Sequence, residues 1–234
     1  ALSKLRRESY RLIISDLMLP RISGHDLIQE IKKVHPCVPL VVMTGYATLD
    51  MALQSFKLGS FDFIPKPFET ETFLAVLFRG LNYSRVMLTR GPEEHAYLPV
   101  AESIRLDEEA ETVYCLGCHS QAKLNEDGTA LVRVGETFSN MMDHLSKLEI
   151  VVSENEITQG KCCVKFFTQD GLINMLWAPL SGKVEAFNEE LDRSVQFINT
   201  DPYGKGWVLR ITPSNLQEEL QNLTRCRRGS LESQ

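Results

Sequence analysis

The sequence predicts two domains of different class, an α/β domain with a parallel sheet followed by a mostly-β domain. The chain has 234 residues, which exceeds the size of an average domain. Apolar runs alternate with helical patterns up to about residue 88, whereas short apolar runs separated by turns dominate from about residue 112. Residues 89–111 are acidic and contain two prolines, so we predict a linker there, with a short strand at 96–106.

The N-terminal domain is predicted to alternate strands and helices. Three apolar runs have the continuous hydrophobicity of strands buried on both faces, at residues 10–16, 38–44 and 61–65. Each is followed by apolar spacing typical of a helix, at residues 23–35, 48–60 and 70–88. Right-handed crossovers place the carboxyl ends of all three strands on one rim of a parallel sheet.

Three polar side chains end these strands and are expected to meet on that rim: Asp16, Thr44 and Lys66. A carboxylate can attack phosphorus as a nucleophile, and a hydroxyl and an ammonium can bind phosphoryl oxygens. Singly, each residue has an ordinary explanation, because an Asp often caps a turn, a Thr suits a strand and a Lys is usually solvated. In this order, they predict phosphoryl transfer to Asp16.

The C-terminal domain is predicted to be a small barrel or sandwich closed by a helix at residues 215–223. Residues 161–180 read as a hairpin with Asp170 and Gly171 at its tip, because Asp-Gly suits a two-residue type I′ turn. The dispersed histidines and the lack of a second catalytic constellation predict a protein that is not an enzyme.

Composition excludes several other classes. The net charge is -6, and the one basic cluster, at residues 225–228, is expected to be a solvated tail, so no nucleic-acid surface is predicted. No apolar run of membrane-spanning length and no signal peptide occur, which predicts no membrane association and a cytoplasmic protein. The scattered cysteines do not suggest a disulfide framework; they are Cys37, Cys115, Cys118, Cys162, Cys163 and Cys226.

The segments IISDLMLPRISGHDLIQEIKK, VPLVVMTGYAT and GSFDFIPKPF resemble the receiver domain of bacterial two-component response regulators, a flavodoxin-like doubly wound sheet. The resemblance implies that Asp16 is the phosphoacceptor in a phosphorelay, charged by a sensor histidine kinase or a phosphotransfer protein. It implies that Thr44 and Lys66 contact the phosphoryl group and that Phe63 occupies the aromatic switch position. It also implies a cis bond between Lys66 and Pro67.

The family also binds Mg²⁺ through the phosphoacceptor, here Asp16, the backbone carbonyl two residues later, here Met18, and an acidic pair on the first strand. The resemblance covers about residues 1–88 and lacks the family's first strand, first helix and second strand, so that acidic pair is missing from this chain. We expect a fragment of a longer receiver, and we expect the chain as it stands to bind Mg²⁺ poorly.

The segments HSQAKLNEDGTALVRVG, APLSGKVEAFNEEL and NTDPYGKGWVLRITPSN resemble the glycine cleavage system H protein, a carrier with a lipoyl-like barrel-sandwich fold. The family carries lipoate on a lysine at a hairpin tip, but Asp170 or Gly171 stands at that position here. We therefore expect a domain without lipoate, over residues 112–234, that acts in docking or oligomerisation. The alternative is a residual glycine-cleavage-like carrier modified at Lys165 or Lys183.

The segment CLGCH, with Cys115, Cys118 and His119, has the spacing of a c-type haem attachment site. The H-protein resemblance matches His119 to a family H-x-W element, with Gln121 in place of the tryptophan. Haem attachment requires export, so haem is not expected. A zinc or thiol-redox site that adds Cys162 or Cys163 remains an alternative.

These observations together predict a phosphorelay response regulator with an H-protein-like effector domain and an unidentified downstream protein partner. A metabolic carrier or a redox protein is the alternative.

Overall fold

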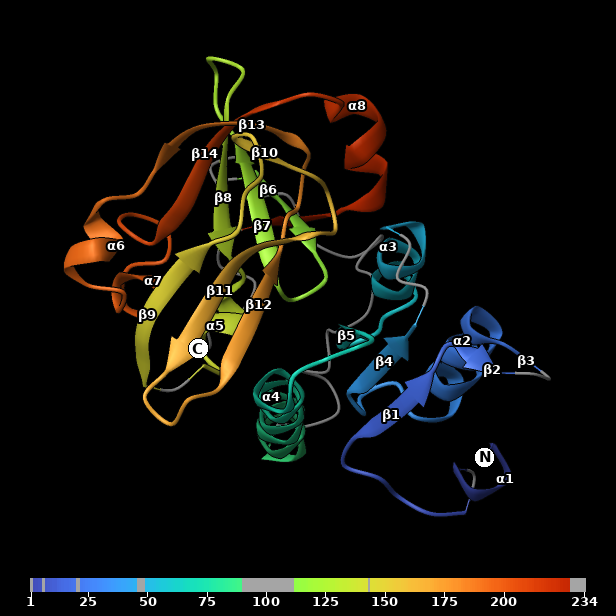
Figure 1. Ribbon diagram of the computed structural model, residues 1–234. Helices are drawn as coiled ribbons and strands as arrows, with labels where there is room; N and C mark the ends of the chain where they lie inside the picture. Colours follow the sequence, from blue (N-terminus) through green and yellow to red (C-terminus); the bar gives the residue numbers. More distant parts are fainter. Residues whose placement is uncertain are drawn as a thin grey trace. The chain divides into compact units, whose positions relative to one another are not determined.

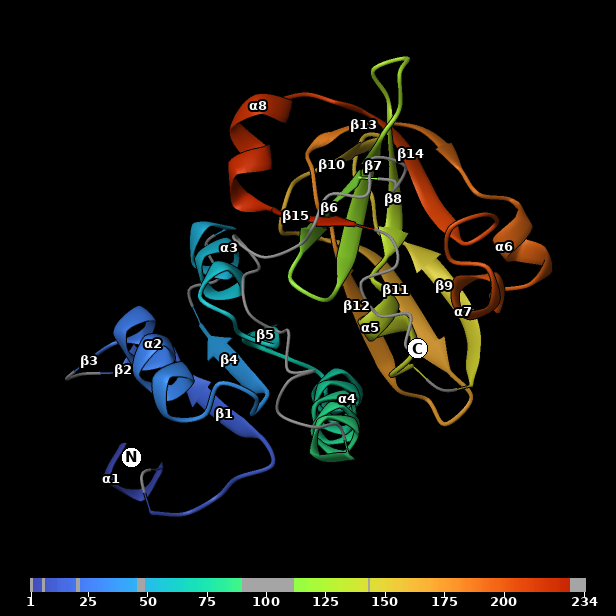
Figure 2. The same cartoon turned by 180° about the vertical axis from the view of Figure 1, so that it is seen from behind.

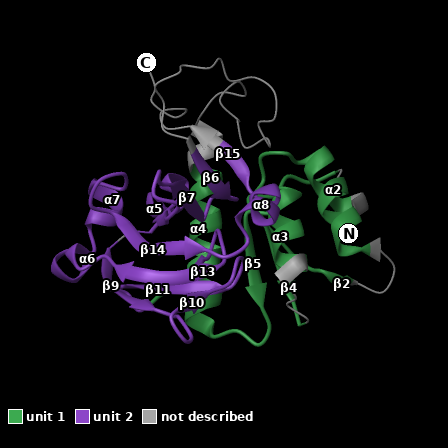
Figure 3. Ribbon diagram, turned by 90° about the horizontal axis from the view of Figure 1, so that it is seen from above, with its two compact units in different colours: residues 1–100, 172–174 green, residues 101–171, 175–234 purple. Residues whose placement is uncertain are grey.

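The computed structural model describes residues 2–5, 7–19, 22–45, 49–89, 112–142 and 144–227. Figure 1 labels the elements along the chain, and Figure 2 shows them from behind. The chain divides into two compact units, residues 1–100 with 172–174 and residues 101–171 with 175–234 (Figure 3). No helix among the described residues is both long and apolar enough to cross a bilayer.

The N-terminal unit alternates strands and helices, as the sequence predicts. Its elements are α1 (Leu2–Leu5), β1 (Ile13–Asp16), β2 (Met18–Leu19), β3 (Ile22–Ser23), α2 (Gly24–Val34), β4 (Leu40–Thr44), α3 (Leu49–Lys57), β5 (Asp62–Pro65) and α4 (Thr70–Thr89).

The sheet of this unit is parallel, with the described strand order β1-β4-β5. Three consecutive residues of β4, Leu40 to Val42, are fully buried, which explains the continuous rather than alternating hydrophobicity of that run. The residues of β1, at one end of this order, are only partly buried. The hairpin of β2 and β3 was not predicted, because strands of two residues carry no readable period.

The C-terminal unit is mostly β, which confirms the second predicted class. Its elements are β6 (Thr112–Leu116), β7 (Ser120–Leu124), β8 (Ala130–Val134), α5 (Glu136–Ser139), β9 (Leu145–Ile150), β10 (Glu156–Ile157), β11 (Cys162–Thr168), β12 (Ile173–Trp177), β13 (Gly182–Phe187), α6 (Glu190–Arg193), α7 (Phe197–Thr200), β14 (Trp207–Pro213), α8 (Leu216–Glu219), the 3₁₀ helix η2 (Leu220–Asn222) and β15 (Thr224–Arg227).

Two sheets enclose the core of this unit. One has the strand order β10-β13-β14-β8-β7-β6-β15 and the other β12-β11-β9. Alternate residues of the strands face a common apolar core, and its largest fully buried aromatic side chains are Phe138 and Phe166.

The chain's C-terminal region differs from prediction in one element. The expected helix at 215–223 is present as α8 and η2, but the chain then continues as β15, which pairs antiparallel with β6. Part of the basic cluster at 225–228 therefore lies in a strand rather than in a solvated tail. The sequence of β15, Thr-Arg-Cys-Arg, shows no alternation of apolar and polar residues. The strand therefore depends on the open edge of β6. The strand expected at 96–106 lies outside the described residues.

The β11–β12 hairpin is present, but its turn is not type I′. Gly171 donates its N–H to Thr168 O (3.1 Å) and has a φ of 84°, whereas Asp170 is not among the residues with positive φ. A type I′ turn needs positive φ at both central residues. The hairpin therefore closes with one left-handed residue, supplied by Gly171.

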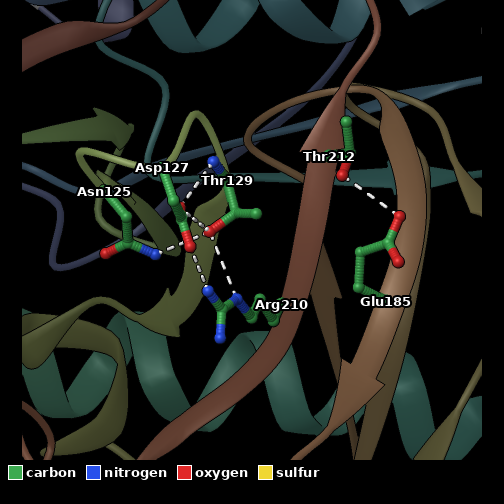
Figure 4. A network of polar contacts seen from close by, with 6 residues as sticks. All are labelled: Asn125, Asp127, Thr129, Glu185, Arg210 and Thr212. Carbon is green, nitrogen blue, oxygen red and sulfur yellow. Dashed lines mark hydrogen bonds and ion pairs between the residues drawn. The ribbon is translucent and has the colours of Figure 1, made fainter.

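A polar network fixes the turn between β7 and β8 (Figure 4). Asp127 accepts hydrogen bonds from the N–H (3.0 Å) and hydroxyl (2.6 Å) of Thr129 and forms an ion pair with Arg210 of β14. Asn125 donates to the same Thr129 hydroxyl (2.9 Å). The Thr129 hydrogen bonds, followed by the nearby Arg210 charge, lower the pKa of Asp127.

Candidate functional site

The ends of the three parallel strands bring the predicted side chains to one rim. Asp16 ends β1 and lies beside Met43, and Thr44 ends β4 and lies beside Pro65 of β5. Lys66 follows β5 directly and donates its backbone N–H to Thr44 O (2.8 Å). The strand ends are adjacent because all three strands run the same way.

The central contact of this rim is between Asp16 and Lys66. Lys66 Nζ donates to Asp16 Oδ2 at 2.6 Å, across the strand that separates β1 from β5. Met18 donates its backbone N–H to Asp16 Oδ1 at 2.8 Å. The Asp16 side chain keeps 31% of its surface exposed, so the carboxylate is reachable from solvent.

The electrostatics favour an ionised carboxylate at this position. The hydrogen bond from Lys66 and then that from the Met18 N–H lower the pKa of Asp16 below its usual value. An ionised oxygen is the form that can attack an electrophilic phosphorus atom. The rim thus pairs a charged nucleophile with an ammonium that can bind the oxygens of an incoming phosphoryl group.

Thr44 and Phe63 are both buried in this unit. Thr44 is 0% exposed at the end of β4, and Phe63 is 3% exposed and pairs in register with Val42. The bond between Lys66 and Pro67 is cis, as expected.

The residues around Asp16 do not by themselves fit a Mg²⁺ ion. Mg²⁺ requires near-octahedral oxygen coordination, and the Asp16 carboxylate, which accepts hydrogen bonds from Lys66 and Met18, is a single ligand of such a set. Within the described part of the chain, no group of three His, Cys, Asp or Glu side chains could hold a metal. The predicted ligands Asp16 and the Met18 carbonyl therefore supply a partial set at most.

Sequence analysis missed a second polar pair, which begins at the amino end of β5, the end opposite the rim. Asp62 and Arg79 form a buried ion pair between β5 and α4, and Asp62 also accepts the Phe63 N–H at 2.7 Å. The available signal was an acidic residue inside an apolar strand together with an arginine inside an apolar helix, since such charges are buried only when paired.

The H-protein-like hairpin presents no lysine at its tip. Asp170 and Gly171 stand there, and the Asp170 carboxylate accepts a hydrogen bond from Thr168. The alternative carrier lysines lie within strands, Lys165 opposite Glu149 of β9 and Lys183 opposite Glu156 of β10. A swinging arm needs an amine at an exposed turn, and neither of these two lysines is at one.

The CLGCH segment covers the last two residues of β6 and the turn that leads to β7. His119 is fully buried, its ring lies 4.5 Å from that of Phe138, and its carbonyl accepts the N–H of Gly135 at 2.7 Å. Cys115 and Cys118 are both buried. The segment thus packs the hairpin against the start of α5.

The adjacent cysteines of β11 are poor candidates for thiolate chemistry. Burial raises the pKa of Cys162 to about 11, and burial raises that of Cys163 further. Both remain protonated near neutral pH, whereas metal binding and thiol exchange require the thiolate. Neither the haem alternative nor the zinc or redox alternative gains support from the geometry.

Comparison with known proteins identifies relatives of each part. Residues 1–78 match the family described as response regulator receiver domain, and residues 113–229 match the family described as glycine cleavage H-protein. The probable glycine cleavage system H protein of Pyrococcus horikoshii is 34% identical over 113 residues, which cover 48% of this chain and 83% of that protein.

Two regulators are similar to the N-terminal part. The DNA-binding transcriptional regulator NtrC of Proteus hauseri is 30% identical over 103 residues, covering 44% of this chain and 22% of that protein. The response regulator protein FleR of Pseudomonas aeruginosa is 37% identical over 79 residues, covering 34% of this chain and 17% of that protein. The chain therefore spans only about a fifth of the length of these regulators.

Proposed function

Because this chain belongs to the glycine cleavage H-protein family and carries a response regulator receiver domain ahead of that part, we propose that it is a phosphorelay response regulator with an H-protein-like effector domain. The 2.6 Å contact between Lys66 Nζ and Asp16 Oδ2 is the observation that carries this proposal. It joins a nucleophile and a phosphoryl-binding cation at the sheet edge where ligands of open α/β folds bind. The proposed domains are residues 1–88 and 112–234, with a linker at 89–111.

The proposed reaction is transfer of a phosphoryl group from a phosphohistidine of a kinase or phosphotransfer protein. An oxygen of ionised Asp16 forms a bond to phosphorus as the bond from phosphorus to the donor imidazole nitrogen breaks, and the imidazole takes up a proton. Lys66 releases the carboxylate and binds a phosphoryl oxygen, and the Thr44 hydroxyl provides a second contact. The product is an acyl phosphate on Asp16.

The H-protein-like domain is proposed to dock a protein partner without carrying lipoate. Asp170 and Gly171 at the hairpin tip support this, because neither offers an amine, and Lys165 and Lys183 lie within strands. Intact mass after coexpression with a lipoate ligase tests it. An unchanged mass is expected, whereas a mass increase that corresponds to a lipoyl group on Lys165 or Lys183 would support the carrier alternative.

Asp170→Lys provides the positive control for that experiment. Asp170 is exposed and does not have the positive φ of Gly171, so a lysine there can adopt the backbone conformation without strain. Lipoylation of this variant, with none of the wild-type chain, is expected. If neither chain is modified under conditions that modify an authentic H protein, the hairpin lacks other features of a lipoate acceptor.

Phosphorylation is tested with the polypeptide produced from its own gene, including any sequence that precedes Ala1. A phosphohistidine donor or a small-molecule phosphodonor should label the wild type and leave Asp16→Asn unlabelled. Label that persists in Asp16→Asn, or no label in the wild type with an active donor, contradicts the proposal.

A further inference from the structure

Strand β9 lies at the edge of its sheet in the described structure. Within the described part of the chain, it pairs with β11 on one side and with no strand on the other. Val151 donates its N–H to Cys163 O (2.8 Å), and backbone groups of successive residues alternate between the two sides of a strand. Leu148 and Ile150 therefore direct their N–H and C=O groups away from β11. An exposed row of this kind is a template for another strand.

A groove runs along the first half of this edge. It has a volume of about 450 Å³, with residues 145–148 of β9 on one side and residues 191–196 on the other. Figure 1 and Figure 2 both show α6 and α7 on the side of β9 away from β11. Leu145 and Leu191 are buried at its base, and Gln196 Nε2 donates to Leu145 O (2.8 Å), which closes the groove at the start of the strand.

The sequence of β9 is self-complementary. Lys147, Leu148 and Glu149 place opposite charges on either side of an apolar residue whose backbone groups face outward. If two copies of β9 pair antiparallel about Leu148, each Lys147 lies directly opposite Glu149 of the other copy. Opposed charges stabilise a cross-strand pair, whereas like charges destabilise it.

The side chains of β9 are already arranged for this pairing. Lys147 and Glu149 are both exposed and, being two residues apart, project from the same face of the strand. Within its own sheet, Glu149 lies opposite Lys165, and Lys147 Nζ lies 4.5 Å from the ring centroid of Phe167. A second copy would continue this row with alternating charge.

We propose that β9 is the interface of a two-fold symmetric dimer of this chain. Leu148 of each copy exchanges two backbone hydrogen bonds with Leu148 of the other, and two pairs of Lys147 with Glu149 flank them. The end of each β9, at Ile150, then lies beside Ser146 of the other copy, in its groove. Pairing joins the two three-stranded sheets into one continuous sheet across the dimer. This inference does not depend on phosphorylation of Asp16.

Charge reversal tests this interface, because a second reversal at the opposing position should restore dimerisation. Lys147→Glu places Glu opposite Glu at both pairs, and Glu149→Lys places Lys opposite Lys, so each variant alone should dimerise roughly tenfold or more weakly than the wild type. Lys161→Glu makes the same charge change in a turn outside β9 and should leave the dimer unchanged. Sedimentation equilibrium of the full chain over a range of concentrations measures the dissociation constant of each dimer.

Mixing the two single variants restores all four opposed charges and should recover dimerisation, as should the double variant that carries both substitutions. Circular dichroism of each single variant establishes that it is folded. A wild-type chain that stays monomeric throughout the accessible concentration range overturns the proposal. Single variants that dimerise as strongly as the wild type also overturn it. So do single variants that dimerise no more strongly when mixed than when alone.

Discussion

Gln159 anchors the C-terminal helical segment to the H-protein-like core, and its replacement by alanine should destabilise that unit by about 2–4 kcal/mol. The side chain is 2% exposed. Its Nε2 donates to Pro179 O (2.9 Å) and Glu219 O (3.0 Å), and its Oε1 accepts from Asn222 Nδ2 (2.8 Å). Each of these three hydrogen bonds contributes about 0.5–1.5 kcal/mol net, and their loss leaves buried carbonyl groups without a donor.

Urea denaturation followed by tryptophan fluorescence measures this effect in the relevant unit. The chain has two tryptophans, Trp177 and Trp207, and both lie in the C-terminal part. Gln221→Ala is the matched control: its exposed side chain lies in η2, the 3₁₀ helix whose Asn222 bonds to Gln159, and the change should alter the free energy of unfolding by less than about 0.5 kcal/mol. Equal effects of Gln159→Ala and Gln221→Ala would refute the account of this anchor.

Three further predictions concern the rim, the core and the hairpin. Lys66→Met should raise the pKa of Asp16 toward its usual value, as measured by NMR of the carboxyl carbon, and an unchanged titration would contradict this. Because the pKa of Asp16 is lower in the folded state than in the unfolded state, the contact with Lys66 stabilises the fold above the unfolded-state pKa. This stabilisation is lost as the pH falls through the folded-state pKa. Phe166→Ala, at a fully buried core position, should lower the free energy of unfolding by about 3–5 kcal/mol, as measured by urea denaturation with tryptophan fluorescence. A decrease below about 1 kcal/mol would show that the site is not well packed. Gly171→Ala should lower the free energy of unfolding by about 1 kcal/mol in the same assay, because the φ of Gly171 is 84°. A Cβ at this position would meet no atom within 4 Å, so the loss comes from the backbone conformation. An unchanged free energy of unfolding would mean that the turn relaxes.

The strands that carry the candidate site could be predicted from the sequence because their signals are local. Continuous apolar runs ending in Asp16, Thr44 and just before Lys66 specify both the parallel sheet and the shared rim, and the structure brings Asp16 and Lys66 into contact. The resemblance to a known family added the cis bond after Lys66, which no local pattern of the chain requires.

The features that were missed depend on partners distant in the sequence. β15 forms only because β6 offers an edge. The ion pair of Asp62 with Arg79 joins a strand to a helix. Single-residue patterns mark such groups as unusual but do not say which of them meet.

The residue that carries the phosphoryl group decides whether Asp16 is the phosphoacceptor. The polypeptide from its own gene is treated with an active phosphohistidine donor, and the modified residue is mapped by tandem mass spectrometry of the peptides. We expect a single acyl phosphate on Asp16, absent from Asp16→Asn. A phosphoryl group on any other residue, or none on Asp16 while the donor labels a known receiver domain, would contradict it.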